Sequence, residues 1–301
     1  MKKLFVFIGC LFSLNAFAQE KLNTFHVVDS KTKKPVKAVS ITIVRAKLSI
    51  NTENDGVFII PGNLIGMRDT VILYAQTYIQ LKIALNKLDG IDTIQMNKFV
   101  SAPGVTQFNY KDDTLLNNFD QNNIGHYAGI HTRNAFFNYL QLAQQFDIKK
   151  VGIRLKTVTV QKLTFNYNPQ KAKFKIRIYD IDSTTGGPGK DLCYDIIEVV
   201  SNESSKQNIN LKNYNIIIPN KTFFVTIEWI RDNYNAGYAM IYDVNIRASV
   251  QHINYRPIIG ISPITGDKLN IWALNFKHEW KPFTYFSPFG TDLAIKATVE
   301  Y

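Results

Sequence analysis

Residues 171–181 read KAKFKIRIYDI, and this stretch decides the fold class. Its apolar residues at positions 174, 176 and 178 alternate with Lys175, Arg177 and Tyr179. A period of two is that of a β-strand, which turns successive side chains to opposite faces. About ten runs of this kind occur between residues 126 and 301, a density typical of an all-β sandwich. We therefore predict a larger, jelly-roll-like β-sandwich over residues 126–301.

Residues 19–98 predict a second, smaller β-sandwich. Short strand-like runs alternate here with turn residues and show no helical period. The runs are FHVV (25–28), AVSITIV (38–44), VFII (57–60), TVILYA (70–75), QLKIAL (80–85) and DTIQM (92–96). Asp55-Gly56 supplies a turn between two of them. Residues 99–125 are polar and rich in Asn and Asp, and we interpret them as a linker in which residues 114–116 could form one helical turn.

The turn chemistry of the first sandwich carries a resemblance to a known family. The matching residues are Val28-Asp29, Thr32, Pro35-Val36, Ala38-Val39 and Asn51-Thr52 through Asp55-Gly56-Val57-Phe58. This pattern resembles the carboxypeptidase regulatory-like domain, a transthyretin-like β-sandwich of exported Bacteroidetes proteins. The chain departs from it at Thr77-Tyr78, where the family usually has Gly-Tyr. The resemblance implies a stabilising or interaction module rather than a peptidase.

The second sandwich is similar to an uncharacterised C-terminal β-sandwich that accompanies this domain in some exported Bacteroidetes proteins. The matching features are Arg177-Ile178-Tyr179, the Gly186–Gly189 loop before Asp191-Leu192, and Phe224-Val225 through Glu228-Trp229-Ile230. That resemblance implies no established chemistry.

The N-terminus predicts export. Residues 1–18 combine two lysines, an apolar run over 4–14 and Ala16-Phe17-Ala18, which is the pattern of a cleaved signal peptide. Cleavage would lower the formal net charge from +11 to 11 − 2 = +9 and leave Cys193 as the one cysteine. We expect that thiol to be buried and inert rather than reactive. The predicted location is the periplasm or the outer-membrane periphery, with no transmembrane span after cleavage.

No catalytic or nucleotide-binding signature occurs in the sequence. H-E-x-x-H, G-x-S-x-G, G-x-G-x-x-G and the Walker A loop are all absent. The first hypothesis is therefore a non-catalytic envelope protein without a cofactor, which binds a protein or a glycan and not nucleic acid. A second is a carbohydrate-active hydrolase that uses two carboxylates such as Glu228 and Asp243. A third is a structural spacer in an envelope assembly.

Several residues are candidates for a site. Residues 271–290 are aromatic and interrupted by proline, so Trp272, Trp280, Tyr285 and Phe286 could form an exposed binding platform or belong to the core. Glu228 lies within an apolar strand, where a salt bridge to Arg177 or Arg231 is favoured over a functional carboxylate. Other candidates are weaker: a calcium site at Asp180, Asp182 and Asp191, and glycosylation at Thr114.

Overall fold

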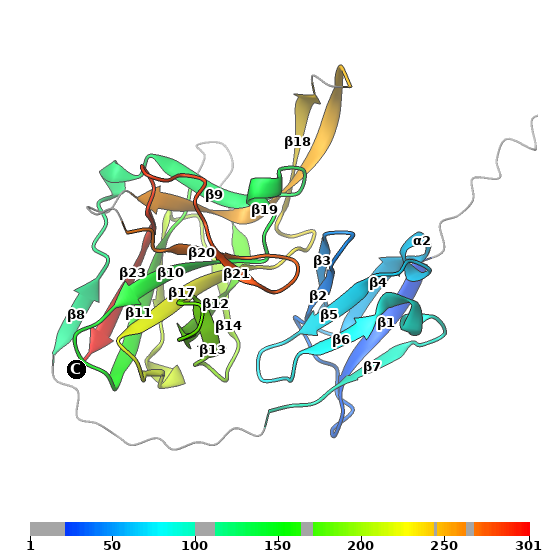
Figure 1. Cartoon of the computed structure of the whole chain (residues 1–301), viewed down its shortest axis with the longest axis horizontal. Helices are drawn as coiled ribbons and strands as arrows, with labels where there is room; N and C mark the ends of the chain where they lie inside the picture. The colour runs from blue at the N-terminus through cyan, green and yellow to red at the C-terminus, as the bar shows by residue number, and fades with distance from the viewer. Residues whose placement is uncertain (1–21, 100–111, 164–170, 244–245, 263–267) are drawn as a thin grey trace, which may run out of the picture.

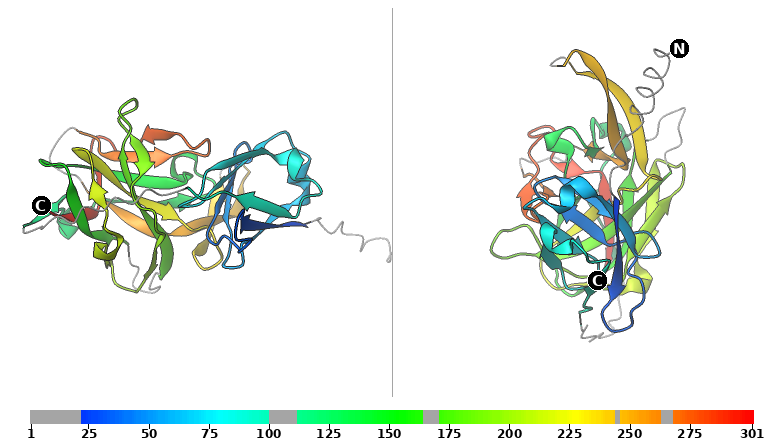
Figure 2. Two further views of the ribbon diagram at one scale, coloured as in Figure 1. Left: turned by 90° about the horizontal axis from the view of Figure 1, so that it is seen from below. Right: turned by 90° about the vertical axis from the view of Figure 1, so that its right-hand side faces the viewer.

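The computed structural model describes residues 22–99, 112–163, 171–243, 246–262 and 268–301. Over these residues the protein is an all-β molecule, as the alternating patterns predict. It has an N-terminal sandwich (residues 22–99) and a larger C-terminal sandwich (residues 112–301), which lie end to end (Figures 1 and 2). The predicted signal peptide lies outside the described residues. None of the helices described is long and apolar enough to span a membrane.

The N-terminal sandwich packs a three-stranded sheet on a four-stranded one. The first sheet has the order β4 (Val57–Pro61), β1 (Leu22–Asp29), β7 (Thr93–Met96). The second has the order β3 (Leu48–Asn51), β2 (Ser40–Ile43), β5 (Thr70–Tyr74), β6 (Leu81–Ala84). The short helices α2 (Gly62–Ile65) and η2 (Leu85–Leu88) add buried residues to the core. In that core the rings of Phe25 and Phe58 stack at 5.1 Å.

Among the positions of this sandwich with a left-handed backbone, Gly56 and Thr77 lie in turns that the sequence pattern singles out. Gly56 has φ +74°, and a Cβ atom there would lie 2.6 Å from the carbonyl oxygen of Val27, so only glycine fits. Thr77 has φ +73°, at the position where the sequence departs from Gly-Tyr. A β-branched residue is strained in this region. The backbone of residue 77 is therefore held in place by its surroundings, including the bond from the Phe99 amide to the Thr77 carbonyl.

The C-terminal sandwich contains three sheets. The largest has the order β13 (Pro188–Asp191), β12 (Ala172–Ile181), β17 (Thr222–Trp229), β10 (Gln141–Asp147), β20 (Ile271–Leu274), β21 (Trp280–Pro282), with β14 (Ile197–Ser201) also on β12. The second has the order β15 (Lys206–Asn210), β11 (Ile153–Gln161), β23 (Ile295–Glu300), β8 (Asp113–Leu116), with β16 (Ile217–Ile218) on β11. The third has the order β18 (Ala236–Asp243), β19 (Ala248–Ser262), β22 (Asp292–Leu293), with β9 (His126–His131) on β19.

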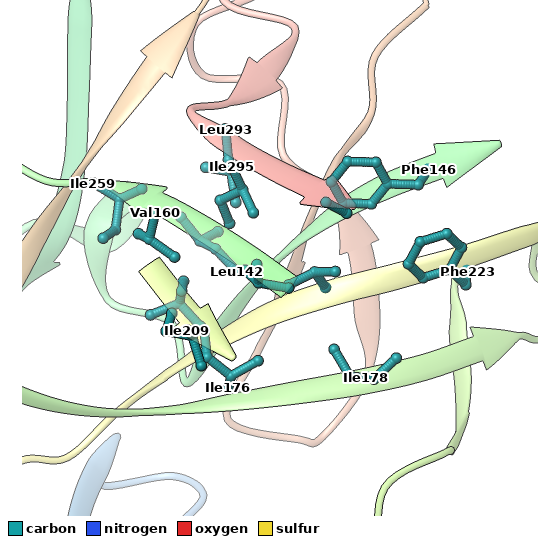
Figure 3. Close-up of a cluster of buried hydrophobic side chains, with 14 of the residues drawn as sticks. Leu142, Phe146, Val160, Ile176, Ile178, Ile209, Phe223, Ile259, Leu293 and Ile295 are labelled. Atoms are coloured by element: carbon teal, nitrogen blue, oxygen red, sulfur yellow. The ribbon is translucent and has the colours of Figure 1, made fainter. Parts of the chain in front are cut away.

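The core of the C-terminal sandwich lies between these sheets (Figure 3). Phe174, Ile176 and Ile178 of β12 are fully buried in it, as their alternation predicts. They meet side chains of the other strands, among them Leu142 and Phe223. Burying one such side chain stabilises the folded state by about 1.5–3 kcal/mol, so this face contributes most of the free energy that holds the strand in place.

The predicted linker contains structure in the part that is described. Residues 113–116 form β8, which pairs antiparallel with β23, so the prediction of a helical turn there is wrong. The edge of β23 offers unpaired backbone groups, and pairing with them outweighs a weak local preference for helix. Thr114 is half-buried on this edge strand. Three further short helices connect strands: η3 (Gln121–Asn123), η4 (Ala135–Phe137) and η5 (Lys212–Tyr214).

β18 and the first half of β19 form a hairpin that projects from the C-terminal sandwich (Figure 1). Tyr238, Met240 and Tyr242 alternate along β18 and are exposed. The second half of β19 is anchored in the sandwich by pairing with β9 and β22.

Candidate site: a cleft between the two sandwiches

The second face of β12 is buried against the N-terminal sandwich. Lys175 is 3% exposed and Arg177 is 1% exposed, although both carry a full charge. The Lys175 ammonium donates to the carbonyl of Ala38, and the Arg177 guanidinium donates to the hydroxyl of Tyr74. Both acceptors belong to the N-terminal sandwich. The alternation of 171–181 thus produces two buried faces, an apolar one toward the core and a polar one toward the other sandwich.

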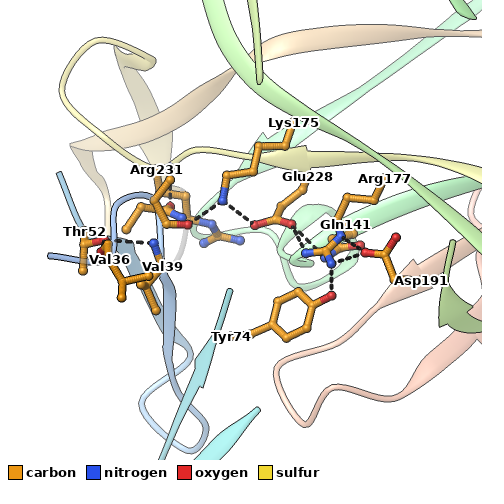
Figure 4. A network of polar contacts seen from close by, with 12 residues as sticks. Val36, Val39, Thr52, Tyr74, Gln141, Lys175, Arg177, Asp191, Glu228 and Arg231 are labelled. Atoms are coloured by element: carbon orange, nitrogen blue, oxygen red, sulfur yellow. Dashed lines mark hydrogen bonds and ion pairs between the residues drawn. The ribbon is translucent and has the colours of Figure 1, made fainter. Parts of the chain in front are cut away.

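Glu228 connects these cations into a closed network (Figure 4). Its Oε1 lies 3.2 Å from Lys175 Nζ, and its Oε2 lies 3.0 Å from Arg177 Nη1. Arg177 also pairs with the carboxylate of Asp191, so two cations face two carboxylates. Burial raises the pKa of Glu228, but the charges of Lys175 and Arg177 outweigh this and hold the pKa below its usual value. Each charge is thereby compensated by an opposite charge of the protein.

The structure confirms the predicted salt bridge from Glu228 to Arg177. Arg231, the other predicted partner, instead donates to Asn138 Oδ1 and to the carbonyl of Tyr139. Both oxygens of Glu228 are occupied. Lys175 contacts Oε1, while Arg177 and Gln141 Nε2, which donates at 3.2 Å, contact Oε2. A carboxylate engaged in this way is a poor general acid or nucleophile.

Asp243, the other carboxylate of the hydrolase hypothesis, is the last residue of β18 in the projecting hairpin, and its side chain lies outside the described part of the structure.

A cavity of about 800 Å³ opens beside this network, between the two sandwiches. Both sandwiches contribute to its wall, the N-terminal one through β5 and the turn after it, the C-terminal one through β12, β13 and the β20–β21 hairpin. The wall contains both aromatic and polar side chains, among them Tyr74, Gln80, Tyr179, Asp191, His278 and Trp280. The volume falls in the range of small-ligand sites, roughly 300–1,000 Å³.

Trp280 is the predicted aromatic residue that the structure places in this cavity. It begins β21 and pairs with Leu274 across the hairpin. Its ring meets Tyr179 edge to face at 5.6 Å and is half-buried. The Tyr179 hydroxyl in turn donates to Gln141 Oε1 at 3.0 Å. The indole is therefore supported from behind by a hydrogen-bonded ring, as a stacking surface requires.

The turn between β20 and β21 inserts His278 into the N-terminal sandwich. His278 Nδ1 lies 3.0 Å from Gln80 Nε2, and His278 Nε2 lies 3.4 Å from Thr42 Oγ1. Burial lowers the pKa of His278 to about 4, so the ring is neutral at pH 7. With Gln80 donating to Nδ1 and Nε2 donating to Thr42, a neutral imidazole satisfies both contacts.

The predicted aromatic platform is divided between two places. Trp272 packs against Phe224 at 6.3 Å and is covered by the loop before β13, where a Cβ atom on Gly187 would lie 2.8 Å from the indole. Tyr285 and Phe286 belong instead to a separate aromatic cluster with Phe136, Phe137 and Phe283. Tyr285 is 46% exposed there. The four aromatic residues therefore do not form one platform, because the turn after β21 carries the two halves of the segment apart.

The three aspartates proposed for calcium do not converge on one ion. Asp180 accepts from Asn220, Asp182 accepts from the Thr184 amide, and Asp191 pairs with Arg177. Across the described ranges, no three or more His, Cys, Asp or Glu side chains are grouped so that they could hold a metal ion. The calcium hypothesis is therefore not supported for these residues.

Cys193 also lines the cavity, but as a neutral thiol. Burial raises the pKa of Cys193 to about 12, and its Sγ donates to the carbonyl of Asp195 at 3.3 Å. A thiol in this state is a weak nucleophile. This agrees with the expectation of a buried, inert cysteine.

Sequence reasoning missed Tyr74, Tyr179 and His278 as members of the site. Tyr74 and Tyr179 lie in ordinary strand patterns, and His278 belongs to no metal-binding or catalytic motif of the sequence. One signal was present: Lys175, Arg177 and Glu228 place charges on adjacent strands whose apolar content predicts burial on both faces.

Comparison with known proteins shows only distant likeness. No protein-family model matches the sequence, and no curated protein matches it. Among solved structures, the cysteine protease and lectin-like domains of Cwp84, a surface layer associated protein of Clostridium difficile, are 10% identical at a TM-score of 0.34, over 88% of this chain and 59% of that one. The clostridial protease Cwp84 after propeptide cleavage is 10% identical at a TM-score of 0.38, over 92% and 70%.

A third structure, of T=1 particles derived from infectious bursal virus, is 8% identical at a TM-score of 0.26 over 93% of this chain and 57% of that one. The chain thus spans less than two thirds of the first and third of these proteins. Such TM-scores provide no basis for assigning a function.

Proposed function

We propose that the protein is an exported, non-catalytic envelope protein that binds a glycan in the cleft between its two sandwiches. The observation that carries the proposal is the cavity of about 800 Å³, in which the half-buried Trp280 is surrounded by polar side chains of both sandwiches. An aromatic face can stack on the apolar face of a sugar ring, and neighbouring polar groups can bond its hydroxyls.

The polar groups of the wall suit neutral, hydroxyl-rich ligands. Asp182, Asp191 and Glu279 are balanced by Arg177, Lys190 and Lys281, so the lining has no strong excess of one charge. A ligand with many hydroxyls can use both donors and acceptors of such a wall. A strongly charged ligand would instead face a like charge on part of it.

The absence of catalysis is part of the proposal. Two groups that could perform chemistry are Glu228 and Cys193. Glu228 is held in ion pairs, and the Cys193 thiol is kept neutral by burial. Export itself rests on the signal pattern of residues 1–18.

A glycan array followed by calorimetry on the full mature chain tests this function. We expect a Trp280→Ala variant to lose at least tenfold in affinity for any glycan that the wild type binds, because the stacking face is removed. Tyr285→Ala is the matched control, since it deletes an exposed aromatic ring of the same segment outside the cavity. We expect this control to bind as the wild type does.

Four results would contradict the proposal. Loss of binding in Tyr285→Ala but not in Trp280→Ala would move the site to the exposed aromatic cluster. Capture of a protein partner without any glycan would favour an interaction module, and a hydrolysed glycan product would favour an enzyme. Binding to neither class of ligand would favour the structural spacer.

A further inference from the structure

Three buried polar atoms without partners lie together where the hairpin leaves the C-terminal sandwich. They are His131 Nδ1, His252 Nδ1 and Asn254 Oδ1, and none has a hydrogen-bond partner among the described residues. The described part of the chain contains seven such side-chain atoms, and three of the seven lie at this one place. Buried polar groups are normally paired, and a cluster of unpaired ones calls for a ligand or water.

The pairing of the strands brings these side chains to one face. His131 of β9 is directly opposite Asn254 of β19, and His252 is two residues before Asn254 on the same face of β19. The ring centroids of His131 and His252 lie 4.9 Å apart, with the planes tilted by 55°. Two imidazoles that share one tetrahedral ion at metal–nitrogen distances of about 2.0–2.1 Å have centroids about 5 Å apart. The observed separation matches this geometry.

The ring nitrogens are also shielded from solvent. A metal ion binds the neutral form of an imidazole, through the ring nitrogen that carries no proton. His252 is 9% exposed, so little solvent competes for its ring nitrogen. Two nitrogen donors and one amide oxygen leave a fourth position for water.

We propose that His131, His252 and Asn254 bind one divalent transition-metal ion of the class that prefers imidazole, such as Zn²⁺ or Ni²⁺. The ion would join β9 to β19 at the base of the projecting hairpin and hold the direction in which the hairpin leaves the sandwich. This site is distinct from the cleft, because none of its three residues lines the cavity.

Calorimetric titration of the chelator-treated full chain with Zn²⁺ tests the site. We expect one equivalent to bind and to raise the melting temperature. We expect His252→Ala and the more conservative His252→Gln to lower the affinity at least tenfold. His126→Ala is the matched control, because His126 lies on β9, the strand of His131, but is exposed and stacks on Phe286 instead. Circular dichroism of each variant at pH 7.5 separates lost binding from lost folding.

A gain of affinity provides the second test. Asn254→Asp replaces the amide oxygen with a carboxylate of nearly the same shape, and we expect it to bind Zn²⁺ about tenfold more tightly. A purely structural role for Asn254 would not produce this gain. The site is refuted if the wild type shows no saturable binding at millimolar Zn²⁺, if His126→Ala rather than His252→Ala abolishes it, or if Asn254→Asp binds no more tightly than the wild type.

Discussion

Protonation of His278 should loosen the contact between the two sandwiches. The imidazole lies between Gln80 and Thr42 of the N-terminal sandwich and is neutral there. A proton on Nδ1 would point at the amide donor of Gln80 and place a charge in a site that burial makes unfavourable. Glu228 raises the pKa of His278, but Lys82 and Arg177 lower it further, so the surrounding charges do not rescue the cation.

The magnitude follows from the pKa of His278, which is about 4 in the folded protein against 6.5 for the free side chain. The folded state therefore binds fewer protons than the unfolded one, and its stability rises with pH. The stability that depends on a neutral His278 is fully present above pH 6.5 and is lost as the pH falls toward 4. Between pH 7.5 and pH 5 the free energy of unfolding should decrease by about 2 kcal/mol through this group.

Urea unfolding of the full chain at the two pH values measures the effect, with His278→Asn as the reference. Asparagine tolerates the φ of +60° at this position and does not titrate. Other groups, including His131, titrate in both proteins, so the difference between the two pH dependences isolates His278. The reasoning is refuted if wild type and variant lose stability in parallel, within about 0.5 kcal/mol.

Three further outcomes follow from the structure. Glu228→Leu leaves the buried Lys175 without a carboxylate and Arg177 with Asp191 alone, and it should lower the free energy of unfolding by about 3–5 kcal/mol. Glu203→Leu breaks an exposed ion pair and should lower it by less than about 1 kcal/mol; equal losses in urea unfolding would contradict the role of the buried network. Thr77→Gly should raise the melting temperature, because it removes the strain of a β-branched residue in the left-handed region, which costs about 1 kcal/mol of stability. An unchanged or lower melting temperature would show that the backbone is unstrained. Cys193 should resist alkylation at pH 8 in the native protein and react once unfolded; equal rates would show that the thiol is accessible.

The sequence alone predicted the elements better than their contacts. Strict alternation over 171–181 correctly assigned the side chains of β12 to two faces, because the period of a strand is a local property. It could not show that Lys175 and Arg177 are buried, since the surface that covers them comes from residues more than a hundred positions earlier.

The site was predicted only in part for the same reason. Trp280 was identified from its aromatic segment, but its grouping with Tyr285 was wrong because a turn separates them in space. β8 was missed because the pairing edge of β23 determines its conformation and its own residues favour no particular structure. The predicted Glu228–Arg177 ion pair succeeded because a buried carboxylate needs a cation and a strand pattern shows which cations are near.

The closed network of Lys175, Arg177, Glu228 and Asp191 has a consequence for exchanging one sandwich of this chain for a foreign one. Lys175 and Arg177 depend on one carbonyl and one hydroxyl of the N-terminal sandwich, while that sandwich receives His278 from the other. A chimera with a foreign N-terminal sandwich of the same outline would leave these cations without the Ala38 carbonyl and the Tyr74 hydroxyl. The two sandwiches are therefore a matched pair rather than interchangeable modules. Because both line the cleft, replacing either one would change the cleft as well.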